Sequence, residues 1–217
     1  VSGGLHGVGA SVVNALSEWL EVTIYHEGKV YQQRYERGHV CYSLKVVGEC
    51  EPEKTGTKVV FLPDKEIFEE TVFDYDVLKQ RFREMAFLTK NLKIELVDLR
   101  TEPETRKVFH YEGGIRTFVE YLNEQKGAEI LNKDVIYVSG RKDTSIAEVA
   151  MQYNDTYNET ILSFANNMHT VDGGTHEQAF KVSLARTINK YGLKFKFLKE
   201  SDPRLKSEDI NEGLIAI

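Results

Sequence analysis

The sequence predicts an α+β fold in two parts. Three observations support this: a glycine-rich loop opens directly onto a helical pattern, alternating strands and an amphipathic helix follow it, and a second set of helices and strands begins after Gly113-Gly114. The first part is predicted to be an α/β sandwich, in which helices cover one face of a mixed sheet. We therefore predict two domains, residues 1–113 and residues 114–217.

The spacing of apolar residues predicts the elements of the first part. Val12, Leu16 and Trp19 recur at helical spacing, whereas apolar and polar residues alternate from Leu20 to His26, which is typical of a half-buried strand. In chain order we expect a helix over 10–20, strands over 20–26 and 29–35, short strands punctuated by Gly38 and Gly48, a strand over 57–62, a helix over 74–88, and strands over 92–99 and 106–111.

Two further helices carry clear apolar stripes. Leu78, Phe82 and Met85 mark the helix over 74–88. The second part begins with a helix over 115–125, whose stripe is Ile115, Phe118, Val119 and Leu122. After it we expect strands over 135–139, 146–153 and 160–165, a long helix over 175–191 with Phe180, Leu184, Ile188 and Tyr191 on one face, and a buried strand at 213–217.

Composition is that of a soluble globular protein, with 41% hydrophobic and 29% charged residues. Residues 1–113 carry 15 Lys and Arg against 19 Asp and Glu, and residues 114–217 carry 13 against 15. Neither part is basic, so composition gives no reason to propose that the chain binds DNA through its phosphates. No apolar run reaches the length of a membrane span, and no signal peptide opens the chain.

Cys41 and Cys50 are the only cysteines, and they form no CxxC pair. They could pair across a hairpin, but two reduced thiols in a cytosolic protein are the favoured interpretation. The chain opens inside a glycine-rich motif and ends in an apolar run, so we interpret it as a piece of a longer polypeptide.

The opening stretch 2–9, Ser-Gly-Gly-Leu-His-Gly-Val-Gly, holds four glycines in seven positions directly before a helix. Glycine tolerates positive φ, so consecutive N–H groups can converge on one anion, and the helix adds its positive end. The stretch therefore predicts a phosphate-binding loop, against the plainer alternative of a tight loop that packs a helix on a sheet. In such a loop His6 suits a conformational or hydrogen-bonding role better than that of a catalytic base.

Two common phosphate loops are disfavoured at defined positions. Gly4 to Ser11 fits the Walker A spacing except that Ala10 replaces the lysine that would pair with the phosphates. Gly7-Val8-Gly9 begins a Rossmann fingerprint, but Val12 stands where the third glycine belongs, and no strand precedes the loop.

The stretch 2–17, SGGLHGVGASVVNALS, resembles almost letter for letter the ATP lid of the ATPase subunits of type II DNA topoisomerases, the gyrase B and topoisomerase IV family of the GHKL superfamily. Residues 54–61 resemble the Gly-Thr strand of that family. Further stretches resemble its domain junction and its transducer domain, so that the resemblance covers the whole chain: 111–115, 118–122, 148–154, 163–167, 172–177 and 212–216.

The resemblance implies that lid N–H groups wrap the triphosphate of ATP and that the Thr57 hydroxyl helps to hold adenine through a water. The implied nucleotide-binding residues are Gly3, Gly4, Leu5, His6, Gly7, Val8, Gly9 and Thr57. The general-base glutamate, the Mg²⁺-binding asparagine and the adenine-binding aspartate of the family are expected upstream of Val1, and its γ-phosphate lysine downstream of Ile217. We therefore assign no catalytic or metal-binding residue, and we predict that the segment alone does not hydrolyse ATP.

The resemblance also implies the C-terminal part of a GHKL (Bergerat) ATPase sandwich over residues 1–113 and an incomplete transducer, like domain 2 of ribosomal protein S5, over residues 114–217. It implies a cytoplasmic protein that uses ATP and Mg²⁺, dimerises on binding ATP, joins the DNA-cleaving gyrase A protein in an A2B2 heterotetramer and acts on double-stranded DNA. Gyrase, with negative supercoiling, is favoured, and topoisomerase IV, with decatenation, is the alternative. GHKL proteins of the Hsp90 or MutL type lack this lid and the downstream Asp-Gly-Gly-Thr-His motif.

Some residues invite sharper interpretations that we do not favour. His169 and His176 flank a glycine turn, but the signal for a metal is weak and we expect loop structure with a helix cap at or near Thr175. Asn166-Asn167 are expected to form a turn. Basic and aromatic residues alternate over 194–199, which predicts a strand with a charged face more than a nucleic-acid stripe, although transducer surfaces of the family line a DNA-accessible cavity.

Overall fold

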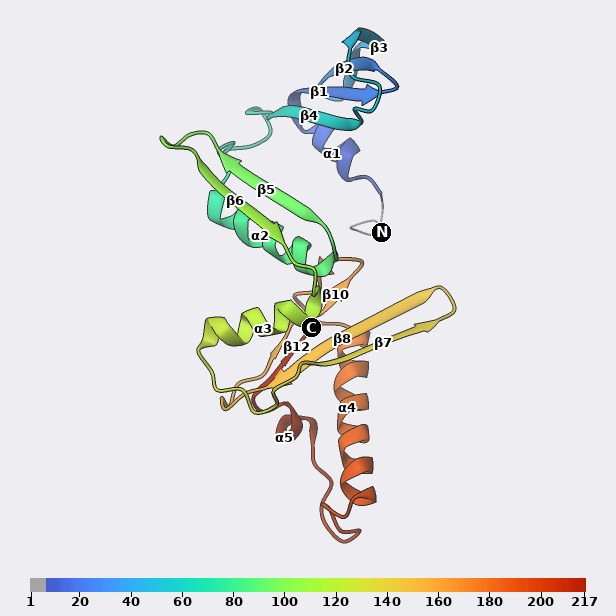
Figure 1. Cartoon of the computed structure of the whole chain (residues 1–217), viewed down its shortest axis with the longest axis vertical. Coiled ribbons are helices and arrows are strands. Elements are labelled where there is room, and N and C mark those ends of the chain that lie inside the picture. Colours follow the sequence, from blue (N-terminus) through green and yellow to red (C-terminus); the bar gives the residue numbers. More distant parts are fainter. Residues whose placement is uncertain (1–6) are drawn as a thin grey trace. The chain divides into compact units, whose positions relative to one another are not determined.

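The computed structural model describes residues 7–217. Packing divides them into two compact units, residues 7–74 and residues 75–217, and each is described by itself (Figure 1). The domain boundary predicted between residues 113 and 114 rests on the break in the sequence pattern at Gly113-Gly114 and on the resemblance, and it stays a prediction. No helix in the described part of the chain is long and apolar enough to cross a lipid bilayer.

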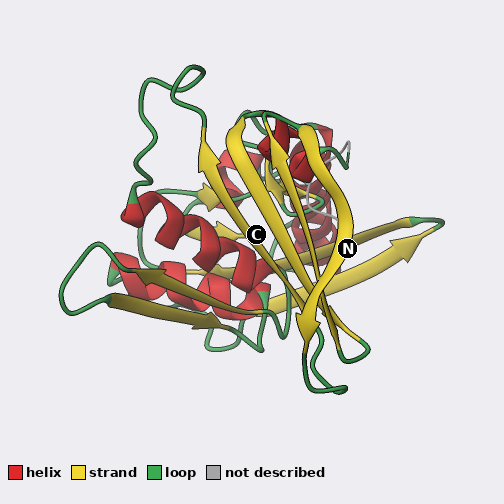
Figure 2. Ribbon diagram, turned by 90° about the horizontal axis from the view of Figure 1, so that it is seen from above, coloured by secondary structure: helices red, strands yellow, loops and turns green. Residues whose placement is uncertain are grey.

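The first unit is an antiparallel sheet with one short helix against it. The helix is α1 (Gly9–Ala15), and the strands are β1 (Ser17–His26), β2 (Lys29–Glu36), β3 (His39–Glu49) and β4 (Gly56–Pro63). The strand order is β3-β2-β1-β4, and the long strands stand out in yellow in Figure 2. Glu27-Gly28 joins β1 to β2 with positive φ at both residues, as a two-residue hairpin turn favours.

Helix α1 is shorter than the predicted helix over 10–20, so that prediction was wrong in its second half. The start of β1 is held on both sides, because Trp19 lies opposite Glu36 of β2 and opposite Leu62 of β4. The Ser17 hydroxyl closes the helix end by donating to the Val13 carbonyl at 2.6 Å. Pairing with two strands outweighs the local helical spacing.

Strand β3 replaces the short strands that we predicted around Gly38 and Gly48. It pairs with β2 from His39 to Glu49, and Gly48 lies inside the strand opposite Val30. The register shifts at three places, one of them next to Gly48, and the ladder continues past each of them.

The second unit begins with a helix packed on a hairpin. The helix is α2 (Tyr75–Leu88), and the hairpin strands are β5 (Lys93–Asp98) and β6 (Thr105–His110). Met85 of the predicted stripe is 40% exposed, and Ala86 takes the core position instead. The core of this part consists of buried Ala86, Leu96 and Phe109, with Leu78 and Phe82 packed against them.

Helix α3 (Ile115–Lys126) packs on a second four-stranded sheet, in which β12 (Leu214–Ala216) lies between β8 (Ser145–Tyr153) and β9 (Thr160–Ile161), and β7 (Ile136–Lys142) pairs with β8. The predicted stripe of α3 is confirmed, since Ile115, Phe118 and Val119 are buried and Leu122 packs on the same core. Ile115 and Val119 meet Ala150 and Ile215 of the sheet. The C-terminal strand is also confirmed.

The strand predicted over 160–165 is interrupted, because β9 and β10 (Phe164–Ala165) belong to different sheets. Strand β10 forms a hairpin with β11 (Met168–His169) through Asn166-Asn167, both with positive φ, which confirms the turn. This two-residue turn needs the left-handed region at each position, which asparagine tolerates.

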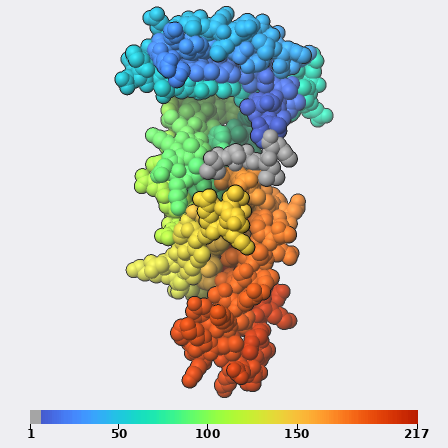
Figure 3. Space-filling model, turned by 90° about the vertical axis from the view of Figure 1, so that its right-hand side faces the viewer, coloured from blue at the N-terminus to red at the C-terminus, as the bar shows by residue number. Residues whose placement is uncertain are grey.

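Helix α4 (Thr175–Lys194) and the short α5 (Ser207–Asn211) complete the unit. The strand predicted over 194–199 was wrong. Helix α4 runs to Lys194 and then ends in a turn, where Phe195 donates its N–H to the Tyr191 carbonyl at 2.9 Å. Without a partner strand, Phe197 is 84% exposed. The end of α4 and the segment after it form the orange-to-red lower part of the surface in Figure 3.

Candidate nucleotide site

Four of the eight predicted nucleotide-binding residues lie among the described residues. Gly7, Val8 and Gly9 form the entry into α1, and Thr57 is the second residue of β4. All four belong to the first unit. The other four lie outside the described residues: Gly3, Gly4, Leu5 and His6.

The entry into α1 has the backbone that the glycine pattern predicts. Gly7 has φ +65°, and a Cβ there would meet no heavy atom within 4 Å, so conformation rather than space calls for glycine. Val8 precedes α1 without any side-chain hydrogen bond to the helix, and the first turn contains no acidic residue. Among residues 7–217 no side chain caps the first N–H groups of α1, which leaves them able to meet an anion.

Thr57 lies on the face of the sheet that α1 covers. Every second residue of a strand points to the same face, so Thr57, Val59 and Phe61 of β4 share one face of the sheet. Val59 and Phe61 line a cavity of about 410 Å³ together with Val13 and Asn14 of α1. The structure thus brings α1 and Thr57, which are distant in sequence, to one side of the sheet.

Helix α1 is anchored at its C-terminal end. The Asp64 N–H donates to the Leu16 carbonyl at 3.1 Å, and the buried Asp64 carboxylate accepts from Arg37 Nε at 2.7 Å. Arg37 also contacts Glu66 at 2.7 Å. Hydrogen bonds to Glu66 and then to Asp64 raise the pKa of Arg37, so the guanidinium stays charged. The end of α1 is therefore tied to the end of β4 and to the β2–β3 turn.

The cavity beside α1 can supply few side-chain contacts to a charged ligand. Its lining within the described residues contains no charged side chain. Asn14 Oδ1 is buried there without a hydrogen-bond partner among the described atoms. A phosphate held at this end of the sheet would thus depend on backbone N–H groups, and we assign no catalytic base.

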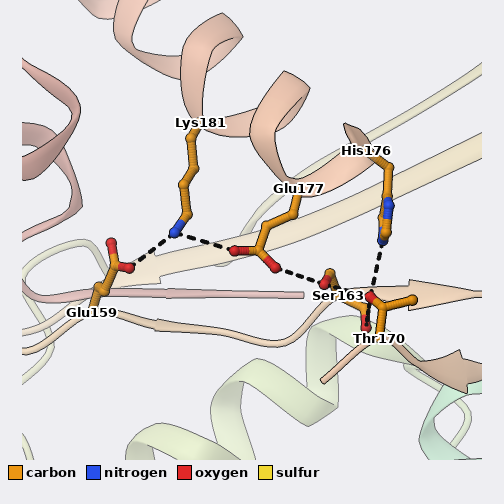
Figure 4. Close-up of polar contacts among 6 residues, drawn as sticks. All are labelled: Glu159, Ser163, Thr170, His176, Glu177 and Lys181. Carbon is orange, nitrogen blue, oxygen red and sulfur yellow. Dashed lines mark hydrogen bonds and ion pairs between the residues drawn. The ribbon is translucent and has the colours of Figure 1, made fainter. Parts of the chain in front are cut away.

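A cluster of polar side chains surrounds the start of α4 in the second unit (Figure 4). Glu177 accepts a hydrogen bond from the Ser163 hydroxyl at 2.8 Å and pairs with Lys181 at 3.2 Å, while Lys181 also contacts Glu159 at 3.0 Å. The Ser163 hydroxyl, followed by Lys181, holds the pKa of Glu177 below its usual range. These contacts fasten α4 to residues on both sides of β9, Glu159 before it and Ser163 after it.

The two histidines of this region do not meet. His176 Nε2 lies 3.1 Å from the Thr170 hydroxyl, whereas His169 packs against the phenylalanine ring of β10. The cap predicted at Thr175 was wrong: Gly174 precedes the helix and no side chain caps it. A Cβ at Gly174 would lie 2.9 Å from the His176 ring, so a capping side chain there would require that ring to move. Across residues 7–217, no three His, Cys, Asp or Glu side chains are grouped to hold a metal ion.

The sequence reasoning missed a buried amide network in the second unit. Asn123 of α3 and Asn154 beside β8 are at most 2% exposed. Asn154 Nδ2 donates to Asn123 Oδ1 at 2.8 Å, and Asn123 Nδ2 donates to Gln152 Oε1 at 2.9 Å. One signal was available, since Asn123 follows Ile115 and Val119 at four-residue spacing and so falls on the buried stripe.

Curated relatives align with the whole chain, and a family model matches its second half. The DNA gyrase B family model matches residues 114–217. The chain is 54% identical over its full length to the DNA gyrase B protein of Clostridium acetobutylicum and 52% identical to that of Enterococcus faecalis, and it covers 33% of each. It thus spans about one third of these curated relatives.

Solved structures give the same match. The 43K ATPase domain of Thermus thermophilus gyrase B, in complex with an aminocoumarin, is 40% identical with a TM-score of 0.83, over 97% of this chain and 57% of that chain. The gyrase B protein of Myxococcus xanthus is 26% identical with a TM-score of 0.81, over 94% and 56%. A topoisomerase IV ATP-binding domain from Francisella tularensis is 23% identical with a TM-score of 0.74, over 100% and 57%, which shows the fold alone.

Proposed function

The chain belongs to the DNA gyrase B family, and we propose that it forms part of the ATP lid, the adjoining strands of the ATPase sheet and most of the transducer of a gyrase B protein. The relatives that align with the whole chain carry the name gyrase B, which favours gyrase over topoisomerase IV.

One observation carries the proposal: a glycine loop without a side-chain cap enters α1 on the sheet face that also bears Thr57. We propose that N–H groups from Gly3 to Gly9 close over the triphosphate of ATP and that the Thr57 hydroxyl helps to hold the adenine. The general base and the Mg²⁺ ligands come from parts of the gyrase B protein outside this chain. The chain alone is therefore proposed to be inactive as an ATPase.

In the whole enzyme, this region is proposed to couple ATP binding to DNA strand passage. ATP binding dimerises two gyrase B proteins, and the transducer passes the nucleotide state to the DNA-cleaving core formed with gyrase A in an A2B2 assembly. The product is negatively supercoiled double-stranded DNA in the cytoplasm. The two free thiols, Cys41 and Cys50, agree with a reducing compartment.

A matched pair of glycine variants tests the lid. Gly7 (φ +65°) and Gly28 (φ +75°) both have left-handed backbones with no steric contact that forbids a Cβ, so alanine imposes similar strain at each. Made in the intact gyrase B protein reconstituted with gyrase A, Gly7→Ala should raise the KM for ATP by about tenfold, since it displaces lid N–H groups. Gly28→Ala, in the β1–β2 turn, should leave KM within about twofold.

Equal effects of the two alanines, or no effect of Gly7→Ala on the binding of a non-hydrolysable ATP analogue, would contradict the assignment of the lid. The assay of the product separates the two candidate enzymes. Gyrase converts relaxed plasmid to negatively supercoiled plasmid with ATP, whereas preferential unlinking of interlocked circles without supercoiling would favour topoisomerase IV.

A further inference from the structure

The second unit contains a cavity that the proposed ATPase function does not use. It has a volume of about 500 Å³ and lies between α2, α3 and the β10–β11 hairpin. Figure 1 shows α2 and α3 as successive green helices, with β10 labelled beside them. The volume falls in the range of small-molecule sites in proteins. Its lining includes Lys79 and Arg83 of α2, Phe118 and Tyr121 of α3, and Phe164 of β10.

One positive charge in this lining lacks a counter-charge. Arg83 is half-buried, and its guanidinium donates to the neutral Tyr121 hydroxyl at 2.7 Å. It also lies over the Tyr121 ring, 5.0 Å from the centroid, and over Phe109 at 5.9 Å. No carboxylate among the described residues forms an ion pair with it. A half-buried guanidinium gains most from a carboxylate or a phosphate, because these accept two parallel hydrogen bonds.

Both acids that line the cavity already have an ion-pair partner. Asp76 pairs with Lys79 at 2.6 Å, and Glu84 pairs with Arg81 at 3.0 Å. The lining carries two acids and two bases, and Arg83 is the one charge among them without an ion-pair partner in the described residues, so an anion that entered would meet it without displacing an existing ion pair.

The aromatic side of the cavity consists of rings that pack against one another. Phe118 is 3% exposed and stacks on the fully buried Phe87, with ring centroids 4.6 Å apart and an interplanar angle of 6°. Phe164 approaches Phe118 at 6.5 Å, and Tyr121 is fixed by Phe87 and Arg83. Phe164 is half-buried, and a ring already held by its neighbours favours a planar, apolar ligand body, because stacking costs it little ordering.

We propose that this cavity binds a small planar organic anion, with its carboxylate on Arg83 and its ring against the half-buried Phe164. A ligand in this position touches α2, α3 and the β10–β11 hairpin at once. It therefore stabilises one arrangement of the three elements and acts as an effector of their packing.

Direct binding of one probe tests the site in the intact gyrase B protein. Titration with 2-naphthoate, followed by ligand-observed NMR, should saturate at one site, whereas the uncharged 2-naphthalenemethanol should bind about tenfold more weakly. Arg83→Met, which keeps the stem but removes the charge, should weaken naphthoate by about tenfold. Arg116→Met is the matched control: Arg116 lies on α3 over the Tyr137 ring and does not line the cavity, so its loss should change affinity less than about twofold.

A second measurement avoids reliance on variants that lose stability. In the unaltered protein, naphthoate ring protons should show NOEs to the ring of Phe164. Absence of these contacts, lack of saturable binding, or equal binding by Arg83→Met would overturn the proposal. None of these outcomes bears on the ATP lid, whose test is the affinity for an ATP analogue.

Discussion

Replacement of Asn123 by alanine should destabilise the second unit by about 3 kcal/mol, because it breaks the buried amide network. Asn123 is 2% exposed, and its side chain makes one hydrogen bond to Asn154 and one to Gln152. Alanine would leave the Asn154 amide and the Gln152 carbonyl without those partners inside the protein. Each buried group left unsatisfied costs about 1–3 kcal/mol, and relaxation around the smaller side chain recovers part of the sum.

Amide hydrogen exchange is the suitable assay, because a chain of two compact units does not guarantee a single unfolding transition. The free energies of opening for amides of α3 and β8 should fall by about 3 kcal/mol, and those of β1 in the first unit should not change. Asn158→Ala is the matched control, since that asparagine is exposed. Its effect should stay within about 0.5 kcal/mol.

A double-mutant cycle sharpens the test. If the contact is real, Asn123→Ala combined with Asn154→Ala should cost less than the two single changes added together, by about 1–2 kcal/mol, because the second change removes a group that the first left unsatisfied. A loss under about 0.5 kcal/mol for Asn123→Ala, or strict additivity, would refute the reasoning.

Three further predictions follow from particular contacts. Because the pKa of Glu177 is lowered in the folded protein, its carboxylate stabilises the fold above its ordinary pKa of about 4.5, and this stability is lost as pH falls through the lower folded value. Glu177→Gln should therefore make the free energy of unfolding of the second unit depend less on pH on the acid side. An unchanged pH dependence would contradict this. Gly213→Ala adds a Cβ at φ +69° that clashes with backbone carbonyls, and it should lower the free energy of opening of β8 amides by about 3 kcal/mol. Gly127→Ala is the control, because the space around Gly127 is open, and it should cost about 1 kcal/mol. Arg37→Ala leaves the buried Asp64 carboxylate without its ion pair and should lower the melting temperature of the first unit, followed by Trp fluorescence, by about 5 °C, whereas Arg37→Lys should recover part of the loss.

The spacing of apolar residues was sufficient to predict an element when that element buries one continuous apolar stripe. The helix from Ile115 was predicted correctly because its apolar residues recur every three or four positions. Spacing failed where pairing with distant strands decided the outcome, as at Ser17, and where a basic and aromatic alternation found no partner strand, as near Phe197. Both failures depend on contacts with segments far away in the sequence, which local spacing does not contain.

The candidate nucleotide site was predictable in part. Period-two alternation is sufficient to place Thr57 on the same face as Val59 once the strand is known, but only the fold shows that α1 covers that face. The ion pair between Arg37 and Asp64 joins two turns, and the spacing of residues in the sequence does not predict it. Nor does it predict the cavity beside Arg83, because its walls come from three separate segments and the lack of an ion-pair partner for Arg83 appears only in the fold.

The turn at Asn166-Asn167 limits how these two positions can vary during evolution. Both have left-handed backbones, where most side chains cost about 1–2 kcal/mol each while asparagine, aspartate and glycine cost little. Lineages that keep the hairpin should therefore favour these three amino acids at either position and avoid β-branched ones. A column of homologous sequences rich in valine or isoleucine would show that the turn has changed, and with it the placement of Phe164.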